Sequence, residues 1–209
     1  MKLLIDAGHG GKDSGAVSGE GKVFEKDVVL AVAKRVHELL APHGESYLSR
    51  ESDRFLSLTE RANLANNLEA DLLSIHCNAG GGRGFEVFTS PGETLSDPWA
   101  TCVLEELHAD FPNRPLRTDV SDGDPDKEAH FIVLTKTRKS AILVELGFID
   151  TEEGQCFLSD PANQERLAQA IARGTLRHHG LDRFVPKKVA SLTLEERVVR
   201  LEKLHPELV

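Results

Sequence analysis

Cysteine is scarce in this sequence, and its cysteines are not spaced for a structural role. Cys77, Cys102 and Cys156 are the only three among 209 residues, and they lie far apart. An odd, scattered set forms neither a disulfide framework nor a paired metal site, so we expect reduced thiols. Cys77 follows His76 on an expected strand, where neighbouring side chains face opposite ways, so the two are not expected to bind one ion.

The sequence also lacks long apolar runs and an excess of basic residues. No run approaches the roughly 20 apolar residues of a membrane span. The net charge of -9 and pI of about 5.5 argue against nucleic acid or an anionic membrane as the main partner. Met1 and Lys2 lead directly into an apolar segment, so we expect no signal peptide and synthesis in the cytoplasm.

Short apolar runs alternate with amphipathic segments along the chain, which predicts a sheet covered by helices on both faces. We expect strands at 2–6, 46–50, 71–76, 84–89, 130–134 and 141–146, and helices at 26–41, 57–69, 94–110 and 162–179. Residues 112–129 contain three prolines and, at 119–128, an acidic cluster, and we expect a long surface loop there.

A change in composition after Leu181 separates a domain at 1–181 from a tail at 182–209. The sequence of the tail predicts a linker followed by a C-terminal amphipathic helix at 192–204. Its leucines and valines form a heptad-like seam that is too short for a confident coiled coil. The helix is expected to dock on the domain, and self-association through 192–208 is the alternative.

The first apolar run, 3–7, ends in a glycine-rich turn that holds His9. Gly8, Gly10 and Gly11 permit backbone conformations closed to other residues and leave space around the imidazole. A phosphate-binding loop would need glycine at Asp6, and the dinucleotide fingerprint would need glycine at Asp13, so neither nucleotide motif is present. The turn therefore favours His9 as a ligand.

A second histidine, His76, ends the run 71–76 beside another glycine-rich turn. A histidine at a strand end is where α/β folds place ligands. Glu25 stands before a helical segment, with Glu20 and Asp27 as neighbours that residue type alone does not separate from it. Two imidazoles and one carboxylate make the protein part of a catalytic zinc site, which predicts a zinc hydrolase.

A carboxylate also interrupts the continuous apolar run 141–149, at Glu145. Such a run is typical of a central strand that is buried on both faces. A buried carboxylate is costly unless it is paired or chemically active. Burial would raise the pKa of Glu145 toward the range of a general base, and a structural ion pair is the alternative.

Together these segments resemble the zinc-dependent N-acetylmuramoyl-L-alanine amidases, the type-3 amidase family of bacterial autolysins and phage endolysins. The resemblance runs from Leu3 to about Leu176. It rests on the segments 5–16, 25–27, 61–63, 74–79 and 144–149, and on Arg50 with Asp53, in the order and approximate spacing of the family.

The resemblance implies a twisted, mixed and mostly parallel sheet with helices on both faces. It implies that His9, Glu25 and His76 bind Zn2+ and that Glu145 is catalytic, which selects Glu25 over Glu20. The implied reaction is hydrolysis of the amide between N-acetylmuramic acid and L-alanine in peptidoglycan, with 1–181 as the catalytic domain. Asn78 is expected to orient the substrate amide.

The chain departs from the family pattern before the last strand. Thr135 follows Val133 and Leu134 where the family usually has an arginine, and we expect Lys136 or Arg138 to substitute for it. Ser140 stands in place of a proline, and Cys77 in place of a small apolar residue.

The missing signal peptide favours a phage or prophage endolysin that reaches the cell wall through a separate pore, with a bacterial autolysin as the other setting. Peptidoglycan is the expected partner, without nucleic acid or membrane insertion. The competing functions are a zinc peptidase or deacetylase on the same scaffold, and a non-catalytic wall-binding module.

Overall fold

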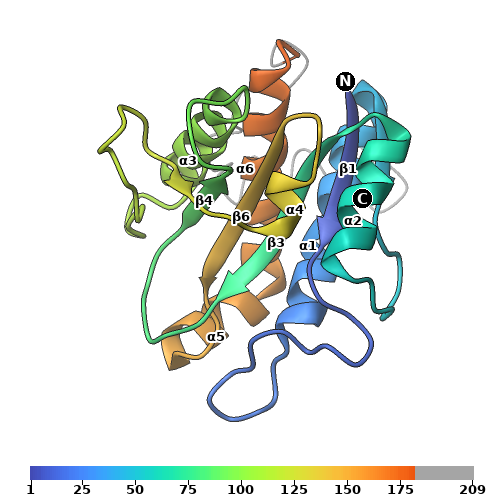
Figure 1. Ribbon diagram of the computed structural model, residues 1–209. Coiled ribbons are helices and arrows are strands. Elements are labelled where there is room, and N and C mark those ends of the chain that lie inside the picture. Colours follow the sequence, from blue (N-terminus) through green and yellow to red (C-terminus); the bar gives the residue numbers. More distant parts are fainter. Residues whose placement is uncertain (182–209) are drawn as a thin grey trace, which may run out of the picture.

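The computed structural model describes residues 1–181, which form one mixed six-stranded sheet between layers of helices (Figure 1). The sheet order is β2-β1-β3-β6-β4-β5. The pair β4–β6 is antiparallel and the other pairs are parallel, which confirms the mixed, mostly parallel sheet. The strands are β1 (Lys2–Ala7), β2 (Glu45–Leu48), β3 (Asp71–Asn78), β4 (Glu86–Thr89), β5 (Lys127–Glu128) and β6 (Ala141–Phe148).

Helices cover both faces of this sheet, as expected (Figure 1). Helices α1, α3 and α6 pack on one face with the larger apolar core, and α2 and α4 pack on the other. The helices are α1 (Glu25–Leu40), the short 3-10 helix η1 (Ala41–His43), α2 (Leu58–Leu68), α3 (Asp97–Asp110), α4 (Ile132–Thr135), α5 (Glu152–Ser159) and α6 (Pro161–His178).

The central strands are buried on both faces, which explains their continuous apolar runs. Leu3 and Ile5 of β1 face the core under α1 and α6, whereas Leu4 faces the core under α2. Successive side chains of a strand point to opposite faces, so one apolar run supplies both cores. Buried parallel strands of this kind fix the positions of their carboxyl ends, where the site lies.

In the segment before β6 one sequence prediction was wrong and another was confirmed only in part. Residues 130–134 do not form a strand, because Val133 and Leu134 are both buried while Phe131 and Ile132 are partly exposed. Adjacent buried residues fit one turn of helix, α4, better than the alternation of a strand. The segment 112–129 is not wholly a surface loop, since it contains β5 and the buried side chain of Asp126.

Two further parts of the chain bear on the prediction: one helix that was not predicted, and a predicted tail that lies outside the described residues. Helix α5 was not predicted, and it begins where Thr151 accepts a hydrogen bond from the backbone N–H of Gly154. The tail at 182–209, with its expected linker, amphipathic helix and self-association, lies outside the described residues.

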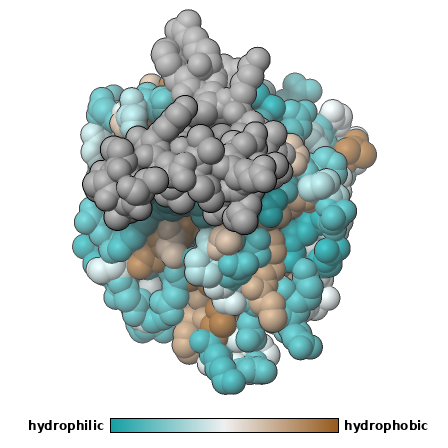
Figure 2. Space-filling model, turned by 180° about the vertical axis from the view of Figure 1, so that it is seen from behind, coloured by the Kyte–Doolittle hydropathy of each residue, from teal (hydrophilic) through white to brown (hydrophobic). Residues whose placement is uncertain are grey.

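Hydrophilic residues cover most of the surface visible from behind the sheet (Figure 2). Across residues 1–181, no helix is both long enough and apolar enough to span a bilayer. The three cysteines are free; Cys77 is buried, Cys102 is half-buried and Cys156 is exposed.

A buried ion pair joins α2 to the end of β1. Arg61 on α2 is 2% exposed, and its Nη1 donates to Oδ1 of Asp6 at 2.6 Å. Burial alone would raise the pKa of Asp6, but the charge of Arg61 and nearby hydrogen bonds hold it below its usual value. The same guanidinium also donates to the backbone carbonyls of Ala7 at 2.7 Å and His9 at 2.6 Å.

Removing this guanidinium should destabilise the whole domain. We expect Arg61→Met to lower the free energy of unfolding by about 3–5 kcal/mol, because it leaves Asp6 as a buried unpaired charge. Urea denaturation measures the loss, with Arg54→Met as the control, because Arg54 is exposed. The control should change stability by less than about 0.5 kcal/mol. Equal effects from both variants would contradict a special role for Arg61.

Candidate metal centre

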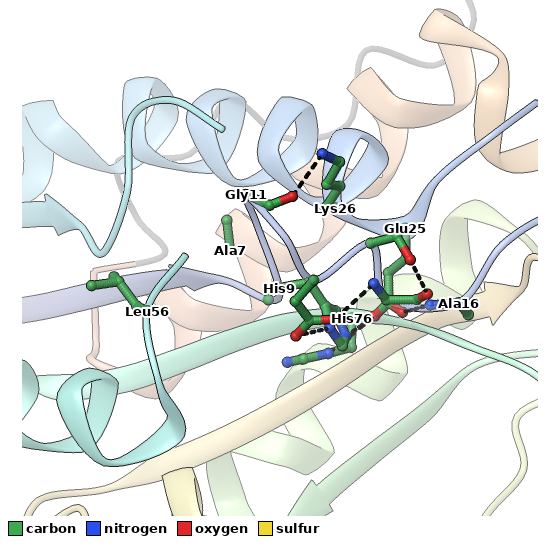
Figure 3. Close-up of polar contacts among 12 residues, drawn as sticks. Ala7, His9, Gly11, Ala16, Glu25, Lys26, Leu56 and His76 are labelled. Carbon is green, nitrogen blue, oxygen red and sulfur yellow. Dashed lines mark hydrogen bonds and ion pairs between the residues drawn. The ribbon is translucent and has the colours of Figure 1, made fainter. Parts of the chain in front are cut away.

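Three elements bring His9, Glu25 and His76 together at the carboxyl ends of β1 and β3 (Figure 3). His9 lies in the turn after β1, Glu25 is the first residue of α1, and His76 lies near the end of β3. Strands β1 and β3 are parallel neighbours, so their carboxyl ends meet at one edge. The ligand atoms of the three side chains all lie within 4.8 Å of one another.

The Glu25 carboxylate lies at the centre of this group and is almost fully buried. Its Oε1 is 3.1 Å from Nε2 of His9 and 3.0 Å from Nδ1 of His76, and it accepts the backbone N–H of Cys77 at 2.8 Å. Its Oε2 accepts the backbone N–H of Ala16 at 2.7 Å. Both carboxylate oxygens are thus held in place by the backbone, and one of them faces both imidazoles.

The His9 ring is oriented by a carboxylate on its far side. Its Nδ1 is 2.9 Å from Oδ2 of Asp13, whose Oδ1 accepts the backbone N–H of Gly15 at 3.0 Å. An Nδ1–H donated to Asp13 leaves Nε2 as the nitrogen that faces Glu25, where it donates to the carboxylate when protonated and can bind a metal ion through its lone pair when neutral. His9 itself has a φ of 58°, a left-handed conformation that non-glycine residues adopt only at a cost.

Two glycines leave the space that the ligands occupy. A Cβ at Gly8 would lie 2.3 Å from Cε1 of His76, closer than two carbon atoms approach. A Cβ at Gly15, where φ is +64°, would lie 2.5 Å from Oε2 of Glu25. The glycines around His9 therefore serve close approach between side chain and backbone, in agreement with the sequence argument for a ligand turn.

The electrostatics of the group favour an ionised Glu25. Burial alone would raise the pKa of Glu25, but hydrogen bonds with His76 and His9 lower it far below its ordinary value. Burial alone would lower the pKa of His9, but the hydrogen bond to Glu25 raises it. The site thus stabilises a buried negative charge by placing positive charge beside it.

The donor set and its spacing fit a zinc ion. Ligands at 2.0–2.1 Å from a tetrahedral zinc lie about 3.3 Å from each other, close to the Glu25–imidazole distances. Imidazole nitrogen and carboxylate oxygen are both zinc ligands, and three protein ligands leave a fourth position open. Cys77 is not in the group, since its side chain packs in the apolar core on the face covered by α1.

Glu145 lies beside this group on β6. In the sheet register it pairs with His76 of β3 on one side and with Glu86 of β4 on the other. Its Oε2 is buried and has no hydrogen-bond partner among the described residues. Burial raises the pKa of Glu145 to about 7, with the charge of His76 opposing the rise and the charges of Glu25 and Glu86 adding to it.

The remaining sequence candidates have other contacts. Glu20 pairs with Lys22 at the surface at 2.8 Å, away from the imidazoles that Glu25 contacts. Asn78 donates from Nδ2 to Glu86 and accepts the backbone N–H of Ala79 at 2.9 Å. These bonds fix the Asn78 amide at the end of β3, two residues beyond His76, where Asn78 is the register partner of Phe148.

The two proposed substitutes for the family's arginine point elsewhere. Nη2 of Arg138 donates to the carbonyl of Asn66 on α2 at 3.1 Å, and Nζ of Lys136 is 3.5 Å from Oγ1 of Thr59. Both therefore lie against α2, before the amino end of β6, whereas the metal group lies toward the carboxyl ends of β1 and β3.

Sequence reasoning missed four residues that shape the site, namely Asp13, Arg50, Arg61 and Glu86. Asp13 could have been found from its i,i+4 spacing to His9 in the same turn. Arg50 and Arg61 belong to segments already noted for the resemblance, but their contacts with the carbonyls around His9 are formed only by the fold.

Comparisons with known proteins show the family of this chain. A protein-family profile described as N-acetylmuramoyl-L-alanine amidase matches residues 3–177. The sporulation-specific N-acetylmuramoyl-L-alanine amidase of Bacillus subtilis is 38% identical over 83% of this chain and 66% of its own length. The endolysin of Bacillus phage SPP1 is 36% identical over 82% of this chain and 64% of its own length. The chain thus spans about two thirds of these two relatives.

Solved structures resemble the whole described domain. The N-acetylmuramoyl-L-alanine amidase from Clostridium difficile 630 superposes with a TM-score of 0.79 at 31% identity, covering 86% of this chain and 96% of that structure. The amidase AmiC2 of Nostoc punctiforme gives a TM-score of 0.78 at 33% identity, covering 86% and 97%.

The raised pKa of Glu145 predicts a pH-dependent stability of the metal-free protein. A carboxyl with a higher pKa in the folded state stabilises the fold below its unfolded pKa, and this contribution is lost as pH rises through about 7. Glu145→Gln removes the ionisation, so the variant should gain about 2–3 kcal/mol over the native chain between pH 4 and pH 8.

Urea denaturation at both pH values in the presence of a chelator measures this difference. Glu93→Gln is the control because Glu93 is exposed, and it should show no such gain. A pH-independent difference between Glu145→Gln and the native chain would contradict the burial of Glu145 as an energetic cost.

Proposed function

The chain belongs to the N-acetylmuramoyl-L-alanine amidase family, and from that membership we propose that it is a zinc-dependent peptidoglycan hydrolase. The bond cut is the amide between N-acetylmuramic acid and the L-alanine of the stem peptide. The observation that carries the proposal is the convergence of His9, Glu25 and His76 beside the unpartnered Oε2 of Glu145. Residues 1–181 are the catalytic unit in this proposal.

Zinc would be held by His9, Glu25 and His76. When bound, it supplies Lewis acidity, which polarises a carbonyl and makes water a stronger acid near neutral pH. Asp13 keeps the His9 ring in the tautomer whose Nε2 faces the site. Glu25 contributes the negative charge, which the backbone N–H groups of Ala16 and Cys77 stabilise.

In this proposal Glu145 acts as the general base and then as the general acid. Its Oε2 accepts a proton from the attacking water and later delivers it to the leaving amine nitrogen. A carboxyl with a pKa near neutrality can do both, because neither protonation state is strongly favoured at pH 7. Asn78 of β3 donates to Glu86 of β4, on the far side of β6, and in this proposal it orients the substrate amide.

The proposed place of action is the bacterial cell wall, because the substrate is peptidoglycan. The name of one relative is endolysin and that of another is sporulation-specific amidase, so the family serves both phage and bacterial wall cleavage. An endolysin or autolysin role is proposed for this chain on the same ground.

Digestion of purified peptidoglycan tests the activity. The zinc-loaded native chain should release stem peptides with a free L-alanine amino group, and Glu145→Gln should lose at least about a hundredfold in rate, since general acid–base catalysis contributes about 10²–10⁴-fold. Zinc content and thermal unfolding of the variant verify that its site and fold are intact.

Each alternative function has its own result in this experiment. Cleavage of unrelated peptides or acetylated sugars, with peptidoglycan stem amides left intact, would identify a zinc peptidase or deacetylase. Binding to peptidoglycan without any cleavage would identify a wall-binding module.

The affinity for zinc should depend on the carboxylate of Asp13, which contacts the His9 ring. Asp13→Asn keeps the hydrogen-bonding shape but removes the charge that orients His9, so zinc affinity should fall about 10- to 100-fold. Competition with a chromophoric chelator measures the affinity, and Glu20→Gln, on the exposed neighbouring carboxylate, is the control. Unchanged affinity in Asp13→Asn would show that the Asp13–His9 contact has no role in binding metal.

A further inference from the structure

A second charged cluster lies next to Glu145, and the mechanism does not use its two cations, Arg117 and Lys127. Glu86 on β4 is 3% exposed, and its Oε1 accepts from Nε of Arg117 at 2.8 Å and from Nζ of Lys127 at 2.7 Å. Its Oε2 accepts from Nδ2 of Asn78. One buried carboxylate thus holds two cations and the amide already placed at the edge of the site.

The cluster carries a surplus positive charge in a chain whose net charge is -9. Glu86 neutralises one of the two cations, and the side chains of Arg117 and Lys127 remain 44% and 29% exposed. The carboxylate of Asp119, which lies near enough to Lys127 to feel its charge, is exposed and accepts the backbone N–H of Ser121 at 3.1 Å. Among the described residues Asp119 forms no ion pair with Arg117 or Lys127, and Glu86 is the carboxylate that pairs with both cations.

Both cations are held in position before any ligand arrives. The backbone N–H of Arg117 donates to the carbonyl of Phe85 at 2.9 Å, and its guanidinium lies 5.1 Å from the centre of the Phe148 ring. Lys127 lies on β5, paired with Phe88 of β4. Binding an anion here costs little side-chain entropy, because the cations are already ordered.

The sheet register places the cluster next to Glu145, on the side away from His76. His76, Glu145 and Glu86 are register partners across β3, β6 and β4. Paired side chains of adjacent strands share one face, and strands are about 4.8 Å apart. Moving along this row from the metal group, a substrate meets Glu145 first and the cationic pair next.

The sequence of metal group, Glu145 and cationic pair along the sheet matches the position of a carboxyl group in the stem peptide. Its second residue is a D-glutamate joined through the γ-carboxyl, so the α-carboxyl is either a free anion or, when amidated, a neutral amide. That group lies roughly 7 Å from the scissile amide, given about 3.6 Å per residue, which is more than the single strand spacing of about 4.8 Å between Glu145 and Glu86 and so extends toward the cations that Glu86 binds.

We propose that Arg117 and Lys127, positioned by Glu86, form an anion subsite that binds the free α-carboxylate of the second stem-peptide residue. The inference rests on the proposed amidase function and names a substrate preference within it. Arg117 offers a planar guanidinium suited to a carboxylate, and Lys127 adds a second charge. Glu86 is a positioning residue, since it acts through the two cations.

Two synthetic substrates that differ only at this group test the proposal. One is N-acetylmuramoyl-L-alanyl-D-isoglutamate and the other is its D-isoglutamine counterpart. The native zinc enzyme should have a kcat/KM about tenfold higher for the carboxylate substrate, carried mainly by KM, as one charge-assisted hydrogen bond predicts. Arg117→Gln should lose this preference, and Arg117→Lys, which keeps the charge, should retain most of it.

Arg83→Gln is the matched control because Arg83 is 49% exposed and pairs with Glu153 at 3.6 Å. It should keep the full preference. Lys127→Met is the second variant, and it should reduce the preference even if Arg117→Gln fails to fold.

Equal cleavage of both substrates by the native enzyme would overturn the subsite while leaving the amidase function intact. A preference that survives in both Arg117→Gln and Lys127→Met would also overturn it. A purely structural role for the cluster would lower the rates for both substrates alike. Failure of the proposed function looks different, since neither substrate would then be cleaved.

Discussion

Two buried arginines hold the backbone carbonyls of the turn after β1, and the geometry of the metal group depends on them. Where β1 ends, the chain leaves the sheet, so the carbonyls of Ala7, Gly8 and His9 need new partners. Arg61 donates to Ala7 and His9, and Arg50 donates to Ala7 and Gly8 at 2.9 and 2.8 Å. An arginine stays charged at any physiological pH, so these contacts do not weaken when the site titrates. They also offset the cost of the left-handed conformation at His9.

With the turn held in this way, the three ligands converge from elements that are distant in sequence. The parallel pair β1–β3 places His9 and His76 at one edge, and the bond from the N–H of Glu25 to the carbonyl of Ala16 ties the start of α1 to the same turn. Glycine at position 8 lets the His76 ring lie directly on the backbone. The row of register partners His76, Glu145 and Glu86 then extends the site across the sheet toward the cationic pair.

Much of this could be predicted from the sequence because it depends on local pattern. The apolar runs of β1, β3 and β6 identified the buried strands, and the glycines around His9 predicted an open turn beside the group that could hold a metal ion. Residue type did not separate Glu25 from Glu20, because the difference is a contact with His76, 51 positions away in sequence. The sequence predicts a strand at 130–134 because so short an apolar run does not distinguish one helical turn from a short strand. The sequence does not predict the role of Glu86, because its partners Arg117 and Lys127 are distant in sequence. They contact Glu86 only in the folded chain, where β4 pairs with β5.

The central claim is that this chain binds zinc through His9, Glu25 and His76 at the carboxyl ends of β1 and β3. X-ray absorption at the zinc edge of the loaded full-length protein tests it most directly. The account predicts nitrogen and oxygen neighbours at about 2.0–2.1 Å, with multiple scattering from two imidazole rings. The imidazole signal should fall by half in His76→Ala. A sulfur neighbour at about 2.3 Å, or an imidazole signal unchanged in His76→Ala, would contradict the account.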